Sequence, residues 1–505
     1  MELRKILVGI EGLKAKGNLD LDISSVEFDY RQVKQGSLFV AIKGYEIDGH
    51  TFINKAIEKG AKAIIFEEGA NYKEFMSAKG VTLIMAPNTR LALAECSCNF
   101  FDNPSKKMKV IGITGTKGKT TTSFMLKAIL EKQGKKVGLI GTIGIYFEDK
   151  LIENSDRTTP ESNKLQQVLA LMYKSGIEVV IMEVSSQSLK LDRVTGMEFY
   201  AGIFTNLSED HISEKEHKDM QEYFESKMKL FNMCHYAFVN ADSIYTARIL
   251  ENMPEGLNIQ TYGIDNNCNL LAKDITITNT YADYRAKVKD RNERIKVSIP
   301  GRFSVYNSLA AISVARLFGS NVEQIKEALE NIKVPGRSEL VENKEDLKIM
   351  IDYAHTPDSL KSILETVKTY TIGRVICVFG CGGDRDSIKR PQMGEVSGRL
   401  ADYTIITSDN PRTEEPEKII SDIEEGIKKT KGNYECITNR REAIKQALRM
   451  ANTKDIVILA GKGHETYQEI KKEKNPFDER KIVKEVLEEI EKEPKKKRKK
   501  LWVIK

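Results

Sequence analysis

A loop at Gly115-Thr116-Lys117-Gly118-Lys119-Thr120 has the residue types and the spacing of a phosphate-binding turn. Apolar residues 110–113 precede it, and apolar residues at helical spacing follow it, which predicts a strand, the loop and then a helix. A glycine-rich turn in this context directs backbone N–H groups toward an anion at a helix N-terminus. Lys119 would reach the terminal phosphates of ATP, and the Thr120 hydroxyl would bind Mg²⁺. A tight turn with an incidental lysine is the alternative interpretation.

The spacing of this loop departs from the common P-loop pattern. That pattern requires a glycine at position 113, where the chain has Ile113. The departure favours a specialised nucleotide-binding protein over a generic P-loop ATPase.

Two other residues could hold a metal ion beside the loop. Glu183 follows the apolar run 179–182, so it would lie at the end of a neighbouring strand, where Mg²⁺ needs a hard oxygen ligand. A helix-start or solvent-exposed carboxylate is the alternative for Glu183. His211 is isolated in the sequence, and both a ligand role and a structural role stay open for it.

The elements that position these residues follow from hydrophobic periodicity. Short apolar runs alternate with helix-like stretches, and breaks fall at Asn103-Pro104 and at Val334-Pro335-Gly336. We therefore predict an α/β fold of three domains: a small N-terminal α/β domain, a central P-loop ATPase-like domain with a mostly parallel sheet, and a C-terminal Rossmann-like domain. The predicted domain limits are 1–105, 106–334 and 335–490, followed by a basic tail at 491–505.

The predicted strands give each domain an edge where ligands could bind. They are 38–42, 63–66 and 82–85 in the first domain, 110–113, 179–182 and 202–204 in the second, and 349–351, 375–379 and 456–459 in the third. A helix over 308–318 is predicted to close the second domain. In open α/β sheets, ligands bind beyond the carboxyl ends of the strands, so the third domain is predicted to be a second ligand-binding sheet.

Composition and charge narrow the protein class. The chain has 505 residues, 40% hydrophobic and 30% charged, which is typical of a globular protein of about three domains. No run of about 18 apolar residues occurs, so we expect a cytoplasmic protein without a membrane span. The seven cysteines lack the paired spacing of a zinc site, and reduced thiols are expected.

The formal net charge of +6 comes from one segment, the six cations of Lys495–Lys500. The body of the chain is therefore not basic, and a nucleic-acid partner is not expected. The segment itself could be an import signal, a polyanion-binding patch or a solvated chain end.

Several motifs in order along the chain together resemble the Mur ligases of peptidoglycan synthesis, over residues from about 25 to about 470. They are the loop Gly115–Thr120, Thr158-Thr159-Pro160, Met182-Glu183-Val184-Ser185-Ser186, Asp210-His211, Tyr306-Asn307, Pro335-Gly336-Arg337 and Asp352-Tyr353-Ala354-His355. Three further motifs resemble the members that add the third amino acid: Phe379–Asp386, Asp409-Asn410-Pro411-Arg412 and Gly461-Lys462-Gly463-His464-Glu465.

The resemblance implies an ATP- and Mg²⁺-dependent amide ligase that acts as a monomer. Its substrates would be UDP-N-acetylmuramoyl-L-alanyl-D-glutamate and meso-2,6-diaminopimelate. The γ-carboxylate of the D-glutamate would first attack the γ-phosphate of ATP, and the amine would then attack the acyl phosphate. Because a free carboxylate is a poor electrophile, the protein mainly has to clamp charge and align the reactants.

The resemblance also implies roles for single residues. For ATP these are Gly115, Thr116, Lys117, Gly118, Lys119, Thr120 and Thr121, with Asn307 on the adenine and Arg337 and Asp352 on phosphate and ribose. One Mg²⁺ would take Thr120 and Glu183, and a second would take His211 and a carbamylated Lys227. The UDP substrate would contact Tyr30, Thr158, Thr159, Ser185 and Arg193. The amino acid would contact Arg385, Asp409, Asn410, Pro411, Arg412, Gly461 and Glu465.

The chemistry of diaminopimelate agrees with the last set. Its second amino-acid centre carries a carboxylate that suits a bidentate guanidinium and an ammonium that suits a carboxylate, which Arg412 and Glu465 could supply. Lysine would leave Arg412 without that carboxylate. A surface ion pair of Arg412 with Glu414 or Glu415 is the alternative.

Rival functions stay open at this point. A lysine-adding or relaxed ligase, or one that builds polyglutamate, is the nearest, and Asp409–Arg412 argues against both. A P-loop ATPase that binds nucleic acid through its tail, or a nucleotide-binding regulator, is the rival from another class. An ordinary exposed helix lysine is the alternative for Lys227.

Overall fold

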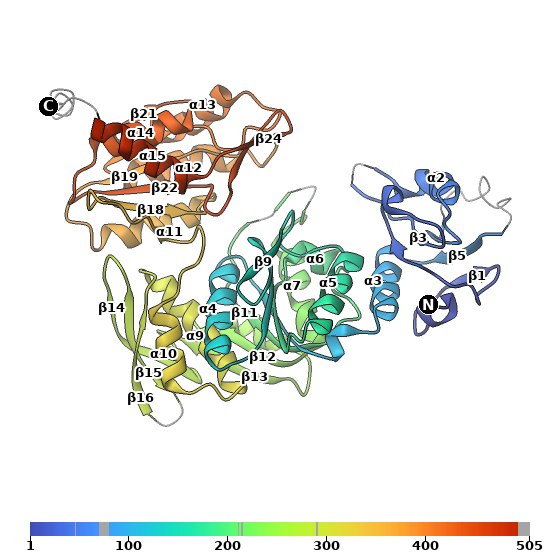
Figure 1. The fold of residues 1–505 in the computed structure, drawn as a ribbon. Coiled ribbons are helices and arrows are strands. Elements are labelled where there is room, and N and C mark those ends of the chain that lie inside the picture. Colours follow the sequence, from blue (N-terminus) through green and yellow to red (C-terminus); the bar gives the residue numbers. More distant parts are fainter. Residues whose placement is uncertain (46, 70–79, 211, 214–215, 289–290, 493–505) are drawn as a thin grey trace. The chain divides into compact units, whose positions relative to one another are not determined.

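The structure, a computed structural model, describes residues 1–45, 47–69, 80–210, 212–213, 216–288 and 291–492 (Figure 1). His211 and the basic run of the tail lie outside the described residues. The chain divides into two compact units, Met1–Leu271 with Tyr306–Ile325, and Ala272–Val305 with the chain from Lys326 onward.

The N-terminal part contains a five-stranded sheet in the order β1-β5-β4-β3-β2, parallel except for β1. Its side chains alternate between two cores: Val40 and Ile65 pack with α1 and α3, whereas Phe39 and Ile64 pack with α2. The strands predicted over 63–66 and 82–85 are confirmed, and the one predicted over 38–42 is present but ends at Val40. The elements are α1 Leu3–Ile6, β1 Lys14–Lys16, β2 Val26–Glu27, β3 Leu38–Val40, α2 Ile53–Glu58, β4 Ala63–Glu67, β5 Thr82–Ala86 and α3 Thr89–Phe100.

The central sheet has eleven strands in the order β16-β15-β14-β13-β12-β11-β6-β10-β7-β8-β9. Strands β7, β10, β6, β11, β12, β13 and β14 run parallel, and the two edges are antiparallel hairpins. The strands are β6 Lys109–Thr114, β7 Val137–Ile140, β8 Gly144–Phe147, β9 Lys150–Asn154, β10 Val179–Glu183, β11 Phe199–Phe204, β12 Cys234–Asn240, β13 Asn258–Gly263, β14 Leu270–Ile277, β15 Ala282–Val288 and β16 Arg291–Val297.

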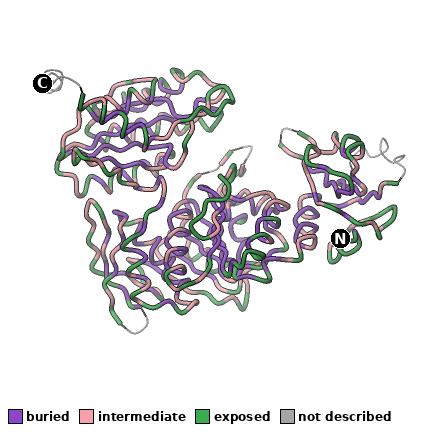
Figure 2. The backbone as a smooth tube through the Cα atoms, viewed as in Figure 1, coloured by how far each residue is buried: buried purple, intermediate pink, exposed green. Residues whose placement is uncertain are grey.

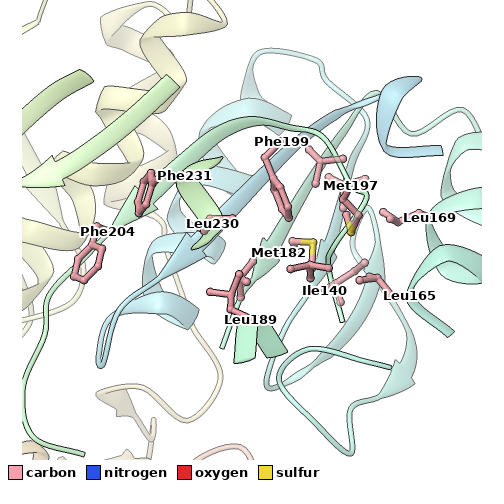
Figure 3. Close-up of a cluster of buried hydrophobic side chains, with 14 of the residues drawn as sticks. Ile140, Leu165, Leu169, Met182, Leu189, Met197, Phe199, Phe204, Leu230 and Phe231 are labelled. Carbon is pink, nitrogen blue, oxygen red and sulfur yellow. The ribbon is translucent and has the colours of Figure 1, made fainter. Parts of the chain in front are cut away.

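Helices of the central part cover the parallel strands. Figure 3 shows apolar side chains such as Met182 and Phe199 packed in one cluster with Leu165 and Leu169. The helix predicted over 308–318 is confirmed within α9. The helices are α4 Lys119–Lys132, α5 Ser162–Lys174, α6 Ser186–Lys190, α7 Met220–Met228, α8 Thr246–Glu251, α9 Arg302–Leu317 and α10 Val322–Glu330.

The C-terminal sheet has six strands in the order β17-β18-β22-β19-β20-β21, parallel except for β17. Cys377 and Phe379 pack against α11, α12 and α13, whereas Ile376 and Val378 pack against α14 and α15, so both faces are covered (Figure 2). The elements are β17 Glu339–Leu340, β18 Lys348–Asp352, α11 Pro357–Lys368, β19 Val375–Phe379, α12 Lys389–Leu400, β20 Tyr403–Ile406, α13 Pro416–Ile427, β21 Tyr434–Cys436, α14 Arg440–Met450, β22 Ile456–Ala460 and α15 Glu479–Lys492.

A separate hairpin, β23 (Tyr467–Ile470) with β24 (Glu473–Pro476), follows β22. The α/β fold with several parallel-rich sheets is as predicted. The described part of the chain has no helix long and apolar enough to cross a membrane.

Candidate active site

Four neighbouring strands of the central sheet end at the same edge. β6 pairs in parallel with β10 and β11, and β10 pairs in parallel with β7. The phosphate loop follows β6, Glu183 is the last residue of β10, Thr142 lies just beyond β7 and Thr205 follows β11. The predicted position of Glu183 beside the loop is therefore observed.

The backbone of the phosphate loop is held by Thr205 and Asn206. Gly115 has φ 137°, and a Cβ there would lie 2.0 Å from Thr205 Oγ1, so only glycine fits. The N–H of Thr116 donates to the Asn206 carbonyl at 2.9 Å, and that of Lys117 donates to Asn206 Oδ1 at 2.9 Å. Two loop amides thus fix the turn rather than face a ligand.

The start of α4 is shaped to receive a ligand. Its N-cap is Gly118, with φ 84° and no capping side chain, so the helix offers its first amides to an anion. A Cβ at Gly118 would lie 2.4 Å from Asn307 Oδ1, which places the Asn307 side chain directly against the loop. Lys119 folds over the turn, and its Nζ donates to the carbonyls of Gly115 and Thr116 at 2.9 and 3.0 Å.

Glu183 is fully buried at the centre of a hydroxyl cluster. The Thr120 hydroxyl donates to Glu183 Oε2 at 2.9 Å, the Thr142 hydroxyl donates to the same oxygen at 3.0 Å, and the Thr142 N–H donates to Oε1 at 2.9 Å. A carboxylate and a hydroxyl in contact beside a phosphate loop are the few hard protein ligands that Mg²⁺ uses next to a nucleotide. The donor set fits the predicted Mg²⁺.

Lys227 is buried on α7 rather than exposed, which argues against the ordinary helix lysine. Its Nζ lies 4.3 Å from the centroid of the Tyr223 ring. Burial, and then the charge of Lys119, lowers the pKa of Lys227 well below its usual value. Both effects favour the neutral form of the amine over the charged form.

Residues predicted to bind the UDP substrate lie close to Glu183 and are linked by hydrogen bonds. Thr159 is buried, and its hydroxyl donates to the Glu183 carbonyl at 2.9 Å and accepts from the Ser185 N–H at 3.1 Å. Arg193 donates to the Thr159 carbonyl at 3.3 Å. Thr158 shares a hydrogen bond with Thr142 at 3.0 Å.

Arg193 is a buried cation whose charge is only partly compensated. Its Nη2 lies 2.8 Å from Glu161, whereas its Nε has no hydrogen-bond partner among the described residues. Burial lowers its pKa despite Glu161. In the N-terminal part, Tyr30 stacks on Phe52 with ring centroids 4.6 Å apart.

The C-terminal sheet has a second polar edge. β18, β22, β19 and β20 are adjacent and parallel, so Asp352, Gly461, the loop after Phe379 and Asp409 lie along it. The Gly461 N–H donates to the Asp352 carbonyl at 3.0 Å. A Cβ at Gly461 would lie 2.6 Å from Asp409 Oδ2, a buried oxygen without a partner among the described residues. The two loops touch.

Asn410 joins the predicted amino-acid residues into one network. Its Nδ2 donates to Glu465 Oε2 at 2.8 Å, and its Oδ1 accepts from Lys462 Nζ at 3.1 Å. Lys462 is fully buried and also donates to Glu465 Oε2 at 3.0 Å. Glu465 is thereby fixed and supplied with a counter-charge.

Arg412 has a partner that the sequence did not indicate. Its Nε donates to Glu469 Oε2 at 3.0 Å and its Nη1 to the Gly383 carbonyl at 2.7 Å. The alternative of an ion pair with Glu414 or Glu415 is wrong in its partner, because Arg412 pairs with Glu469 and Glu414 pairs with the buried Arg390.

The remaining members of this set border the same loops. Pro411 abuts the glycine-rich loop, since a Cβ at Gly383 would lie 2.0 Å from the Pro411 carbonyl oxygen. Arg385 is exposed on that loop. The Gly383 N–H donates to the Asn410 carbonyl at 2.9 Å, which ties the two loops together.

Arg337 and Asp352 lie together at this edge. The Ser338 N–H donates to Asp352 Oδ2 at 2.7 Å, and the Arg337 guanidinium lies 4.5 Å from the Tyr353 ring centroid. Burial raises the pKa of Asp352, and Arg337 opposes that shift. Burial also lowers the pKa of His464 to about 3, so this imidazole is neutral beside Arg337.

Comparisons with known proteins agree with this architecture. The Mur ligase family, catalytic domain matches residues 22–101, the Mur ligase middle domain matches residues 113–315, and the Mur ligase, glutamate ligase domain matches residues 336–463. A protein of Caldanaerobacter subterraneus subsp. tengcongensis, 47% identical over 97% of this chain and 100% of its own length, is named UDP-N-acetylmuramoyl-L-alanyl-D-glutamate–2,6-diaminopimelate ligase. The chain belongs to the Mur ligase family.

Other members of the family show the same likeness. A Clostridioides difficile protein of the same name is 44% identical over 97% of this chain and 100% of its own length. A solved structure of a ligase with that name has a TM-score of 0.68 and 29% identity, over 98% of this chain and 100% of its own. A MurF ligase from Thermotoga maritima in complex with ADP has a TM-score of 0.59 at 19% identity, over 94% and 98%, which shows the fold alone.

In this Mur ligase, sequence reasoning missed residues that hold the predicted ones. Thr142 and Asn206 lie in loops after strands, and the rule that ligand-binding residues follow parallel strands could have found them. Lys462 lies within the motif that contains Glu465, but its burial has no local signal. Glu469 lies in a hairpin that no sequence pattern indicated.

Proposed function

We propose that this Mur ligase adds meso-2,6-diaminopimelate to the D-glutamate of UDP-N-acetylmuramoyl-L-alanyl-D-glutamate, with ATP as the energy source, in peptidoglycan synthesis. The observation that carries the proposal is the bonding of the Asp409–Arg412 loop, in which Asn410 binds the Glu465 carboxylate and Arg412 binds the Gly383 carbonyl. The names of full-length relatives that are more than two-fifths identical support the same substrates.

ATP binds at the loop Gly115–Thr120 and the first turn of α4. Lys119 leaves its carbonyl partners for the terminal phosphates, Thr121 lies in the same turn, and Asn307 positions the adenine. Thr120 and Glu183 would hold Mg²⁺, which would supply positive charge to neutralise the phosphates. The protein's own part is to align the substrate carboxylate with the γ-phosphate.

Lys227 is proposed to be carbamylated and to act with His211 at a second Mg²⁺. Support comes from the lowered pKa of Lys227, because a neutral amine is the form that reacts with carbon dioxide. Carbamylation would turn the buried neutral amine into an anionic oxygen ligand, whose charge a bound Mg²⁺ would offset.

The dipeptide end of the UDP substrate is proposed to contact Thr158, Thr159, Ser185 and Arg193. Support comes from Arg193, a buried guanidinium with an unused Nε donor in contact with Thr159. Tyr30, stacked on Phe52, is proposed to border the uridine end.

Amino-acid recognition is proposed to use both charges of the second centre of diaminopimelate. The ammonium would contact Glu465 and Asp409, whose Oδ2 lacks a partner among the described residues. The carboxylate would contact Arg412 and Arg385. Asn410, Pro411 and Gly461 shape the loops that carry these groups.

Arg337 and Asp352 are proposed to assist ATP through its phosphate and ribose, after closure of the C-terminal domain. Their local setting supports the proposal, because both lie at the ligand-binding edge of their sheet. We further propose that the enzyme works as a monomer in the cytoplasm, with domain limits at 1–105, 106–334 and 335–490.

The experiment that tests the function offers the purified chain ATP, Mg²⁺, the UDP dipeptide and either diaminopimelate or L-lysine, with product mass as the readout. The expected product is the diaminopimelate tripeptide. Product with lysine alone would overturn the specificity, and product with neither would overturn ligation.

Removal of residues 494–505 separates this proposal from a nucleic-acid-dependent ATPase. The truncated chain is expected to keep its ligase rate, within about twofold, because none of the residues proposed for binding or catalysis lies in the segment removed and solvated charges are screened by salt. Turnover that responds to nucleic acid and is lost on truncation would favour the rival function.

A further inference from the structure

The guanidinium of Arg412 already has hydrogen-bond partners within the protein when no substrate is bound. Nε donates to Glu469 and Nη1 donates to the Gly383 carbonyl, whereas Nη2 makes no hydrogen bond to a described residue. Arg412 and Glu469 are each about three-quarters buried. An incoming carboxylate would therefore bind the open end of a guanidinium that already has one carboxylate partner.

Hydrogen bonds of the backbone hold the main chain of Glu469 beside Arg412. The Arg412 N–H donates to the Glu469 carbonyl at 3.0 Å, and the Lys471 N–H donates to the Arg412 carbonyl at 2.7 Å. The Glu469 N–H donates to Asn410 Oδ1 at 2.9 Å. The hairpin β23–β24 is thus hydrogen-bonded to two residues of the loop Asp409–Arg412, namely Asn410 and Arg412.

We propose that Glu469 tunes the choice between diaminopimelate and lysine by serving as the partner of Arg412 when the substrate brings no carboxylate. The inference rests on the proposed function. When lysine is bound, Glu469 still compensates the charge of Arg412, so lysine is not excluded by an unpaired buried cation. Discrimination then comes from the binding free energy that the second carboxylate of diaminopimelate gains at Arg412. Glu469 reduces that gain.

The charge of Glu469 should act differently on the two amino acids. The second carboxylate of diaminopimelate approaches Arg412 against the like charge of Glu469. Both amino acids carry an ammonium at this end, which the same negative charge attracts, but lysine has no carboxylate there for Glu469 to repel. Lys474, opposite Glu469 in the hairpin register, has its Nζ 4.6 Å from the Tyr467 ring centroid and remains in every variant below.

The test is Glu469→Gln, with Glu473→Gln as the matched control. Glutamine keeps the acceptor for Arg412 Nε and removes the charge. Glu473 is an exposed carboxylate on the same hairpin, with no side-chain hydrogen bond or ion pair to a described residue. Both variants and the wild type are assayed with diaminopimelate and with L-lysine, and their melting temperatures are compared.

In Glu469→Gln, KM for diaminopimelate is expected to fall about threefold, and the preference for diaminopimelate over lysine in kcat/KM is expected to rise by at least that factor. Glu473→Gln should match the wild type. A merely structural role would raise KM instead. Glu469→Ala, which also loses the charge, should shift the preference in the same direction.

An unchanged or higher KM for diaminopimelate in Glu469→Gln, with the wild type active, would overturn this inference and leave the ligase function intact. A wild type that forms no product with either amino acid would overturn the proposed function, and the inference with it. The two failures are therefore distinguishable.

Discussion

Replacement of Gly118 by alanine tests how closely Asn307 approaches the phosphate loop. Gly118 precedes α4 and Gly134 follows it, and their φ angles are nearly equal, at 84° and 86°. A Cβ at position 118 would lie 2.4 Å from Asn307 Oδ1, whereas nothing lies within 4 Å of one at position 134. Gly134→Ala is therefore a control with the same backbone strain and no overlap.

The left-handed backbone costs alanine about 1 kcal/mol at either site. Both variants should then melt a few degrees lower, roughly 2–4 °C. At position 118 alone, Asn307 or the loop must move by about 1 Å to reach ordinary contact, and a shift of that size in a positioning group can cost about 100-fold in rate. We expect kcat/KM for ATP to fall about 10- to 100-fold in Gly118→Ala and to stay within about twofold in Gly134→Ala.

The assay is steady-state ADP release with the UDP dipeptide and diaminopimelate saturating and ATP varied. Equal kcat/KM for ATP in the two variants would refute the placement of Asn307 at the nucleotide. A larger loss in Gly134→Ala would refute the strain argument as well.

Three further substitutions probe the buried charges. In buffer stripped of carbon dioxide, Lys227→Met should have a higher free energy of unfolding than the wild type at neutral pH, because the lowered pKa of Lys227 favours proton binding in the unfolded chain. The difference between the two proteins should shrink as pH rises toward the ordinary pKa of lysine. Urea titrations at several pH values measure it. Glu183→Gln should lower kcat by about 100-fold and raise the Mg²⁺ requirement, as measured by metal titration. Arg440→Met should cost roughly 3–5 kcal/mol in urea unfolding, because it leaves the buried Glu479 carboxylate uncompensated.

Parallel strands such as Val179–Met182 and Val375–Phe379 could be predicted because they are buried on both faces and form continuous apolar runs. The antiparallel edges were missed for the opposite reason. β9 is exposed throughout, and β16 begins Arg291-Asn292-Glu293-Arg294, so neither has an apolar run. Their pairing depends on neighbours that the local sequence does not reveal.

The residues proposed to bind the amino acid also could be predicted only in part from the sequence. Arg412 and Glu465 could be assigned from their motifs and from the chemistry of the ligand. Glu469 could not, because its contact with Arg412 spans 57 residues and depends on the backbone pairing of a short hairpin with a loop. Lys462 likewise gains its role from burial beside Asn410.

The most direct measurement of the central claim is ADP release by the purified chain in matched mixtures. The mixtures contain ATP and Mg²⁺ with both the UDP dipeptide and diaminopimelate, with either one alone, or with neither. The account predicts rapid ADP release only in the full mixture, with one ADP formed per tripeptide. Release at the same rate with ATP alone, or without tripeptide in the full mixture, would contradict it.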